Sequence, residues 1–99
     1  MKPTQAPVRQ PGPGELQPVF NLYNAGRLAE AANAARQLLA RYPGAVVLHS
    51  VLGSALASLG RLDEAAAEFR RAAALTQNGR ERTLLLERAA RCARNAGSG

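Results

Sequence analysis

Apolar residues recur at helical spacing along most of the chain, and glycine or proline interrupts this pattern at short intervals. The interruptions stand at Asn24-Ala25-Gly26, Tyr42-Pro43-Gly44, Gly60, Gln77-Asn78-Gly79 and Asn95-Ala96-Gly97. A glycine directly after a helix supplies the left-handed residue that closes it. The pattern therefore predicts five helices, over residues 15–25, 28–41, 45–59, 62–76 and 80–95, joined by turns short enough to make neighbours antiparallel.

Alanine fills many positions of the predicted apolar stripes. Small side chains at the crossing points allow helix axes to come close together, while leucines and Phe69 fill the remaining space. Pro18 falls in or just after the first turn of the first helix, which predicts an irregular start there.

One hexapeptide occurs twice, as GRLAEA from Gly26 and as GRLDEA from Gly60, so the two copies lie 34 positions apart. A helix pair with this period is typical of the tetratricopeptide repeat. The segment from Val46 to Gly79 resembles that family at its packing positions. These are Leu52, Gly53, Leu56, Gly60, Ala65, Phe69 and Ala72. His49 stands where the family usually has tryptophan, and Gln77 where proline is common.

The segment from Gly12 to Ala45 resembles the same repeat less closely. Its matches to the pattern are Gly26, Leu28, Ala31, Leu38 and Pro43. Glu15 and Pro18 stand where an aromatic residue and leucine are expected. A terminal repeat tolerates such differences because one of its faces has no neighbouring repeat.

The fifth helix fits the repeat in two registers. A strict count of 34 places Glu87 at a packing position, where an unpaired carboxylate is costly to bury. Three extra loop residues instead place small or apolar residues at the packing positions, which are Leu86, Ala89, Ala90 and Ala93. We adopt this second register, with Gly97 at the closing turn. The fifth helix then caps the second repeat, and Arg82 and Arg88 are expected to make its outer side basic.

The domain prediction follows from these assignments. Residues 1–14 are rich in proline and glycine and are predicted to be a disordered tail. Residues 15–97 form one helical repeat domain, and residues 98–99 are a frayed end or linker remnant. The resemblance implies an all-α, right-handed array of stacked helix hairpins.

The resemblance also implies a scaffold that binds peptides or partner proteins along its concave face. On the first helix of each pair, the groove residues are predicted to be Leu16, Phe20, Tyr23, Asn24, Val47, Ser50, Ser54 and Ser58, and on the fifth helix Arg91 and Arg94. The groove is thus expected to be aromatic at one end, small and polar in the middle and basic at the other. Phe20 and Tyr23 have an alternative role, packing on the tail or on Pro18. The Lys and Asn clamp with which some relatives bind chaperone C-termini is missing, since its sites here are Leu16, Phe20 and Val51.

The charge of the chain leaves a second function open. The formal net charge is +6, and most cations are arginine. A cluster of arginines could contact nucleic-acid phosphates: Arg70, Arg71, Arg80, Arg82, Arg88, Arg91 and Arg94. Glutamates interrupt this cluster at helical spacing and no aromatic residue in it can stack on a base, so protein binding is favoured over nucleic-acid binding.

Candidate catalytic chemistry is scarce. The chain has one histidine and one cysteine, but His49 occupies a packing position and Cys92 lies among alanine and arginine. Neither a metal-ligand spacing nor a phosphate-binding loop is present in the sequence. We therefore predict no enzyme activity, no catalytic residues, no metal and no cofactor.

The cellular setting is also an expectation from composition. A single cysteine suits a reducing compartment, and the N-terminal residues lack the apolar core of a signal peptide. No apolar run reaches the length of a membrane span. The chain is expected to be cytoplasmic, and its arginine and alanine bias is typical of a GC-rich bacterial genome.

Self-association is a further possibility for the first repeat. No preceding helix is predicted to cover it, because the proline-rich tail cannot form one. Leu16, Phe20 and Tyr23 then lie at a partly exposed end, which is expected to receive either the partner or a second copy of the chain.

Overall fold

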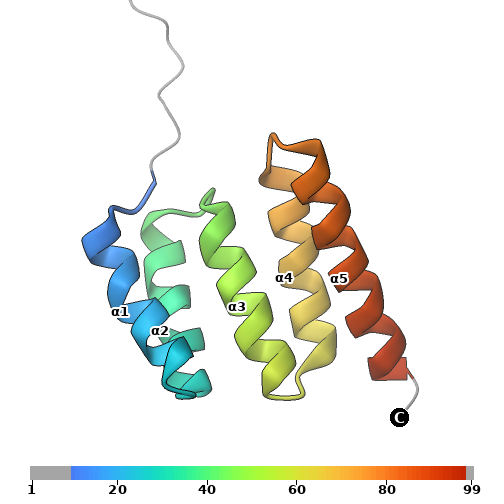
Figure 1. Ribbon diagram of the computed structural model, residues 1–99, viewed down its shortest axis with the longest axis horizontal. Coiled ribbons are helices and arrows are strands. Elements are labelled where there is room, and N and C mark those ends of the chain that lie inside the picture. Colours follow the sequence, from blue (N-terminus) through green and yellow to red (C-terminus); the bar gives the residue numbers. More distant parts are fainter. Residues whose placement is uncertain (1–9, 98–99) are drawn as a thin grey trace, which may run out of the picture.

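The computed structural model describes residues 10–97, which form a row of five helices (Figure 1). The helices are α1 (Pro13–Asn24), α2 (Leu28–Arg41), α3 (Val46–Ser58), α4 (Leu62–Leu75) and α5 (Gly79–Gly97). The all-α prediction is confirmed. Each helix packs mainly on the one before and the one after it in the chain, as expected of a stacked repeat.

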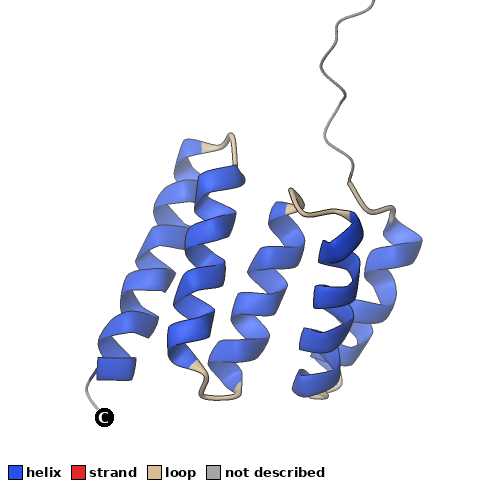
Figure 2. Ribbon diagram, turned by 180° about the vertical axis from the view of Figure 1, so that it is seen from behind, coloured by secondary structure: helices blue, strands red, loops and turns tan. Residues whose placement is uncertain are grey.

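The helices form two hairpins and a final single helix. α1 pairs with α2 and α3 pairs with α4, while α5 packs on α4. Seen from behind, α2 lies in front of α1, so the members of this hairpin occupy different layers of the array (Figure 2). Within residues 10–97, no helix combines the length and apolarity that crossing a membrane requires.

The repeated hexapeptide builds the same turn in both hairpins. Gly26 and Gly60 have φ angles of 79° and 81°, a conformation that side chains with a Cβ rarely adopt. The arginine after each glycine forms two hydrogen bonds with the glutamate three positions later. Arg27 contacts Glu30 at 2.6 and 2.9 Å, and Arg61 contacts Glu64 at 2.7 and 2.9 Å.

A core of small and aliphatic side chains runs through the whole array. Its largest fully buried side chains are Val19, Leu48 and Leu56, and alanines of α2 and α4 fill much of the rest. Gly53 allows the ring of Phe69 to lie against the backbone of α3, because a Cβ at Gly53 would be only 3.0 Å from the ring. The alanine-rich faces therefore bring the helix axes close together.

Helix α1 differs from the prediction at its start. It begins at Pro13 rather than at residue 15, since a proline suits the first helical position and Glu15 accepts a hydrogen bond from the Gly12 backbone N–H at 3.1 Å. Pro18 lies inside α1, and the helix continues through it without the irregular start that was expected. Pro13 and Gly14, which the prediction assigned to the tail, are therefore helical. Residues 1–9 of the predicted tail, like residues 98–99, lie outside the described part of the chain.

Helix α5 is longer than predicted at both ends. Asn78, rather than a preceding glycine turn, starts it by accepting a hydrogen bond from the Glu81 backbone N–H at 2.9 Å. The helix runs on to Gly97, two residues past its predicted end at residue 95. Gly26 and Gly60 are the glycines with positive φ in the described residues, so Gly97 does not form the left-handed turn.

The packing face of α5 also differs from the prediction. Leu85, Ala89 and Cys92 are buried, whereas Leu86 is 47 % exposed and Ala90 is exposed. The buried positions lie 37 residues after Leu48, Leu52 and Ala55, the buried positions of α3, so the register with three extra loop residues describes them. Leu86 and Ala90 correspond to His49 and Gly53, which face the second helix of their own hairpin. No described helix occupies that place beside α5.

Candidate ligand-binding groove

Two adjoining hollows lie on the side of the array shared by α1, α3 and α5. One has a volume of about 290 Å³ and the other about 270 Å³. Both are lined by Tyr23, Ser54 and Arg88, so they form one continuous surface, which we call the groove. The first helix of each hairpin and the final helix therefore contribute side chains to one concave surface.

The α1 end of the groove is aromatic. Phe20 and Tyr23 both line it, and each is half-buried. Their neighbours on α3 are Ser50, Val51 and Ser54. Flat rings beside short side chains offer contact area to a ligand at low conformational cost.

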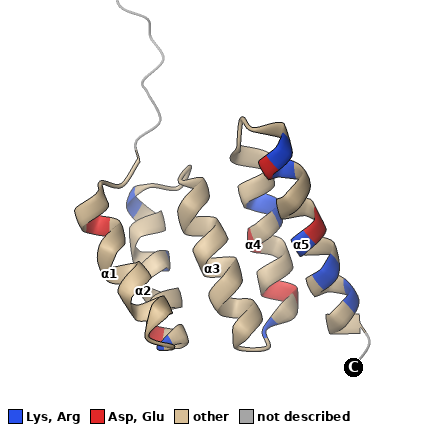
Figure 3. Ribbon diagram, in the orientation of Figure 1, with Lys and Arg blue, Asp and Glu red and all other residues tan. Residues whose placement is uncertain are grey.

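The α5 end of the groove is basic. Arg88 and Arg91 line it, beside Cys92 and the buried ring of Phe69. The guanidinium carbon of Arg88 lies 5.8 Å from the centre of the Phe69 ring, within range of a cation–π contact. Neither arginine forms an ion pair with another described residue, and no described Asp or Glu lines either hollow. Helix α3, between the two ends of the groove, carries no Lys, Arg, Asp or Glu (Figure 3).

Half of the predicted groove residues line these hollows. Phe20, Tyr23, Ser50, Ser54 and Arg91 do so. The other five do not line them: Leu16, Asn24, Val47, Ser58 and Arg94.

The structure adds groove residues that the sequence prediction left out. Val51, Phe69, Arg88 and Cys92 line the hollows. Arg88 follows Val51 by 37 positions, the same offset that relates the buried residues of α5 and α3. The repeat register therefore already indicated that Arg88 lies on the same side of the array as Val51. Arg88 was instead expected on the outer side of α5.

A comparison with protein-family models matches residues 21–80 to the tetratricopeptide repeat. This match covers more than half of the chain, from the last turn of α1 to the start of α5. The chain belongs to the tetratricopeptide repeat family. Comparison with curated proteins and with solved structures gave no match. Tetratricopeptide repeat domains generally mediate protein–protein interaction and are typically non-catalytic.

Histidine at position 49 plays a structural part in the second tetratricopeptide repeat. The residue is 8 % exposed. Nδ1 lies 2.8 Å from a carboxylate oxygen of Glu68, and Nε2 lies 2.9 Å from the carbonyl oxygen of Pro43. A neutral ring donates to one of these two acceptors, whereas the imidazolium donates to both. His49 thus connects α3 to α4 and to the loop before α3, and its ring nitrogens contact these groups rather than Cys92.

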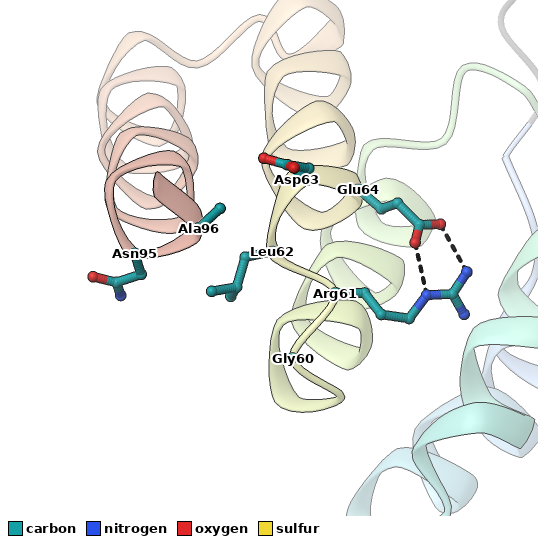
Figure 4. Close-up of a pocket in the computed structure, with 7 residues that line it drawn as sticks. All are labelled: Gly60, Arg61, Leu62, Asp63, Glu64, Asn95 and Ala96. Atoms are coloured by element: carbon teal, nitrogen blue, oxygen red, sulfur yellow. Dashed lines mark hydrogen bonds and ion pairs between the residues drawn. The ribbon is translucent and has the colours of Figure 1, made fainter. Parts of the chain in front are cut away.

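A different hollow lies beside the turn of the second repeat (Figure 4). It has a volume of about 360 Å³, and its lining is formed by Gly60, Arg61, Leu62, Asp63, Glu64, Asn95 and Ala96. Arg61 donates two hydrogen bonds to the carboxylate of Glu64 there. Asp63 and Glu64 both lie in the first turn of α4. These carboxylates disfavour an anionic ligand, and an apolar surface comparable to that of Phe20 and Tyr23 is lacking. We therefore regard the groove as the better candidate site.

The arginine cluster predicted from the sequence is divided among several structural roles. Arg71 pairs with Glu68. Arg82 donates hydrogen bonds to the carbonyl oxygens of Ala73 and Thr76, at 3.2 and 2.8 Å, and so satisfies the C-terminal end of α4. Arg88 lies over Phe69 and lines the groove, so its predicted place on the outer side of α5 is wrong.

Proposed function

We propose that this chain is a non-catalytic interaction module that holds an extended peptide segment of a partner protein in the groove. The family supports the general role, and one observation supports the site. The groove joins an aromatic surface at α1 to two arginines at α5 without an acidic residue between them. A peptide with an apolar side chain followed by a carboxylate matches both ends.

The arginine end supports the choice of a carboxylate. Arg88 is held in position by the ring of Phe69, which is 3 % exposed. A planar guanidinium with no acidic partner is suited to bind a carboxylate through two parallel hydrogen bonds. Arg91 lies one helical turn further along α5 and can contact a second acidic group or the peptide backbone.

The middle of the groove supports an extended backbone. Ser50 and Ser54 are short, half-buried and one helical turn apart on α3. Their hydroxyls can donate to or accept from the peptide backbone. Bulky side chains at these positions would fill the space between the aromatic and basic ends.

Selection from a display library of short random peptides tests this function. We expect the selected peptides to be enriched in an aliphatic or aromatic residue near Asp or Glu. Their binding should be lost in Arg88→Glu/Arg91→Glu and retained in the control Arg70→Glu/Arg80→Glu, whose arginines are exposed on α4 and α5 outside the groove. Equal loss in both variants would show only a response to net charge, and would contradict the proposed site.

A change at the aromatic end of the groove distinguishes nucleic-acid binding. A labelled single-stranded oligonucleotide should bind weakly, and its affinity should fall steeply with salt because it depends on phosphate contacts. Peptide binding should persist at moderate salt because part of it is apolar burial. Tight oligonucleotide binding that is insensitive to Phe20→Ser/Tyr23→Ser would favour the nucleic-acid alternative.

A further inference from the structure

Hydrogen-bond donors dominate the polar lining of the larger hollow of the groove, whose volume is about 290 Å³. Its strongly polar side chains are the guanidinium groups of Arg88 and Arg91 and the hydroxyls of Tyr23 and Ser54. All four can donate, and no described Asp or Glu lines this hollow to accept. A polar ligand group placed among these side chains must therefore supply several acceptor oxygens.

Two like charges lie close together in this hollow. Arg88 and Arg91 are three positions apart on α5, a spacing at which helical side chains are neighbours and like charges repel. Neither forms an ion pair with another residue of the range 10–97. Glu87 lies one turn before Arg91, but it lines neither hollow and forms no ion pair in that range either. An anion bound between the two arginines would relieve their repulsion.

The first of these arginines is held in place. The guanidinium carbon of Arg88 lies 5.8 Å from the centre of the Phe69 ring, which belongs to the buried core. A cation–π contact with a buried ring favours one position of the guanidinium and so lowers the entropic cost of binding an anion. Arg91 is exposed and has no such support, so it can turn toward an anion that Arg88 already holds.

We infer that the groove binds a phosphorylated side chain of the partner peptide, with its phosphate between Arg88 and Arg91. This inference rests on the proposed function and replaces the carboxylate named there by a more specific acidic group. At neutral pH such a phosphate carries about two negative charges on three strong acceptor oxygens, whereas a carboxylate carries one charge on two oxygens. A single phosphate therefore matches both guanidinium groups and also offers an acceptor to the hydroxyl of Ser54 or Tyr23.

The inference makes binding depend on modification of the partner. An unmodified hydroxyl at the same position of the peptide is neutral and leaves the repulsion between Arg88 and Arg91 unrelieved. The apolar contact with Phe20 and Tyr23 is then the main attraction that remains. Asp or Glu selected from a display library, which offers no phosphorylated residue, stands in for the phosphate.

Five libraries of labelled synthetic peptides test the inference by fluorescence polarisation with the full chain. They share the same random flanking positions and differ at the centre, which is phosphoserine, phosphotyrosine, one glutamate, two adjacent glutamates or serine. We expect at least one phosphorylated library to bind about tenfold or more tightly than the single-glutamate library, because its phosphate forms more charge-assisted hydrogen bonds. The library with two glutamates should bind less tightly than the phosphorylated one, since its two charges lie on separate groups.

Single variants test whether one phosphate contacts both arginines. Arg88→Gln and Arg91→Gln should each reduce the preference for the phosphorylated over the single-glutamate library to about twofold or less. The control Arg70→Gln removes the same charge from an exposed position of α4 outside the groove and should keep the preference. Circular dichroism checks that all three variants remain helical. A preference that survives either Arg88→Gln or Arg91→Gln would overturn the inference.

A lower pH gives an independent readout. The second ionisation of a phosphate has a pKa of about 6, so its charge falls between about pH 7.5 and pH 5.5, whereas glutamate stays ionised. The preference for the phosphorylated library should therefore shrink over this interval. A change in the charge of the protein itself would affect both libraries and leave their ratio unchanged. A constant preference would contradict recognition of the doubly charged phosphate.

The libraries also separate this inference from the proposed function. If a glutamate library binds as tightly as both phosphorylated libraries, and its binding is lost in Arg88→Gln, the inference is overturned and the proposed function is supported. If no library binds, both are overturned. Tight binding of a phosphorylated library, lost in both groove variants and kept in Arg70→Gln, supports both.

Discussion

The two hairpins of this array have equivalent turns but different side chains packed between their helices. Between α1 and α2 and between α3 and α4, the same glycine, arginine and glutamate form the same left-handed turn and the same pair of hydrogen bonds. Between the two helices of each hairpin, equivalent positions hold different pairs of side chains. The second repeat has Gly53 on its first helix and Phe69 on its second, whereas the first repeat has Val19 and Ala35 at these positions.

The polar links within the hairpins differ in a similar manner. The position of His49 in the second repeat corresponds to Glu15 in the first. His49 is nearly buried and contacts Glu68, whereas Glu15 accepts a hydrogen bond from the Tyr42 hydroxyl at 2.8 Å and pairs with Arg41 at 3.2 Å. The turn therefore determines how the helices are joined, and the space between them permits more than one combination of side chains.

The largest effect is expected at the aromatic layer of the second repeat. Phe69→Ala should lower the free energy of unfolding by about 3–5 kcal/mol, because it leaves a cavity beside Gly53. Gly53→Val alone should cost about 1–3 kcal/mol, since the new side chain would clash with the ring. Chemical denaturation measures both variants, in an osmolyte if Phe69→Ala is too unstable in buffer.

The double variant Gly53→Val/Phe69→Ala transfers the pair of the first repeat into the second. Its cost should be clearly smaller than the sum of the two single changes, because the valine fills part of the space that the ring leaves. A cost equal to the sum would mean that the two repeats do not use this layer in equivalent ways.

A smaller effect is expected from the polar links. His49→Phe should cost about 1–3 kcal/mol, because it leaves the Pro43 carbonyl and one oxygen of Glu68 without this partner. Tyr42→Phe should cost about 0.5–1.5 kcal/mol, because Glu15 keeps its contacts with Gly12 and Arg41. Replacing both partners in His49→Phe/Glu68→Leu should recover part of the loss. A cost for Tyr42→Phe larger than that for His49→Phe would contradict the greater weight given to the two contacts of His49.

The shared turn predicts equal effects in the two hairpins. Gly26→Ala and Gly60→Ala should each cost about 1–2 kcal/mol, since alanine strains the left-handed conformation. An added Cβ meets no atom within 4 Å at either position, so the cost is purely conformational. Thermal unfolding of the two single variants should give matching shifts, and a large difference between them would show that the turns are not equivalent.

The smallest effects belong to the arginine pairs of the turn. Arg27→Ala and Arg61→Ala should each cost about 0.2–1 kcal/mol, because both pairs are about half exposed. High salt should reduce the cost further. If either cost survives at molar salt, the arginine contributes more through its packing than through its charge.

Most of the fold could be predicted because glycine marks the turns. The bounds of α2 were predicted correctly, and those of α3 and α4 differ from the prediction by one residue at most. The start of α1 was missed because Pro13 and Gly14 were taken as part of the tail, although proline is well suited to the first helical position. The end of α5 was missed because Gly97 continues the helix instead of closing it.

The candidate site was harder to predict than the fold. Helical spacing was enough to bring Phe20, Tyr23, Ser50 and Ser54 to one side of the array. It did not reveal Arg88, whose direction depends on how α5 rotates against α4. That rotation is set by which apolar face of α5 packs, and leucine or alanine occurs on two sides of the helix, at Leu85 and Ala89 and at Leu86 and Ala90. Periodicity alone does not decide between two such faces.

The two contacts of His49 have a consequence for how the array opens. Stacked repeats contact only their neighbours, so a short array can lose its structure from one end, a repeat at a time. A single imidazole here bonds both to α4 and to the loop that joins the two repeats. If α3 separates from α4, His49 also loses its bond to the loop between α2 and α3. If that loop moves away first, His49 loses a contact that holds it against α4. We expect the amide hydrogens of α2, α3 and α4 to exchange as one cooperative unit, with α1 and α5 opening at lower free energy on either side.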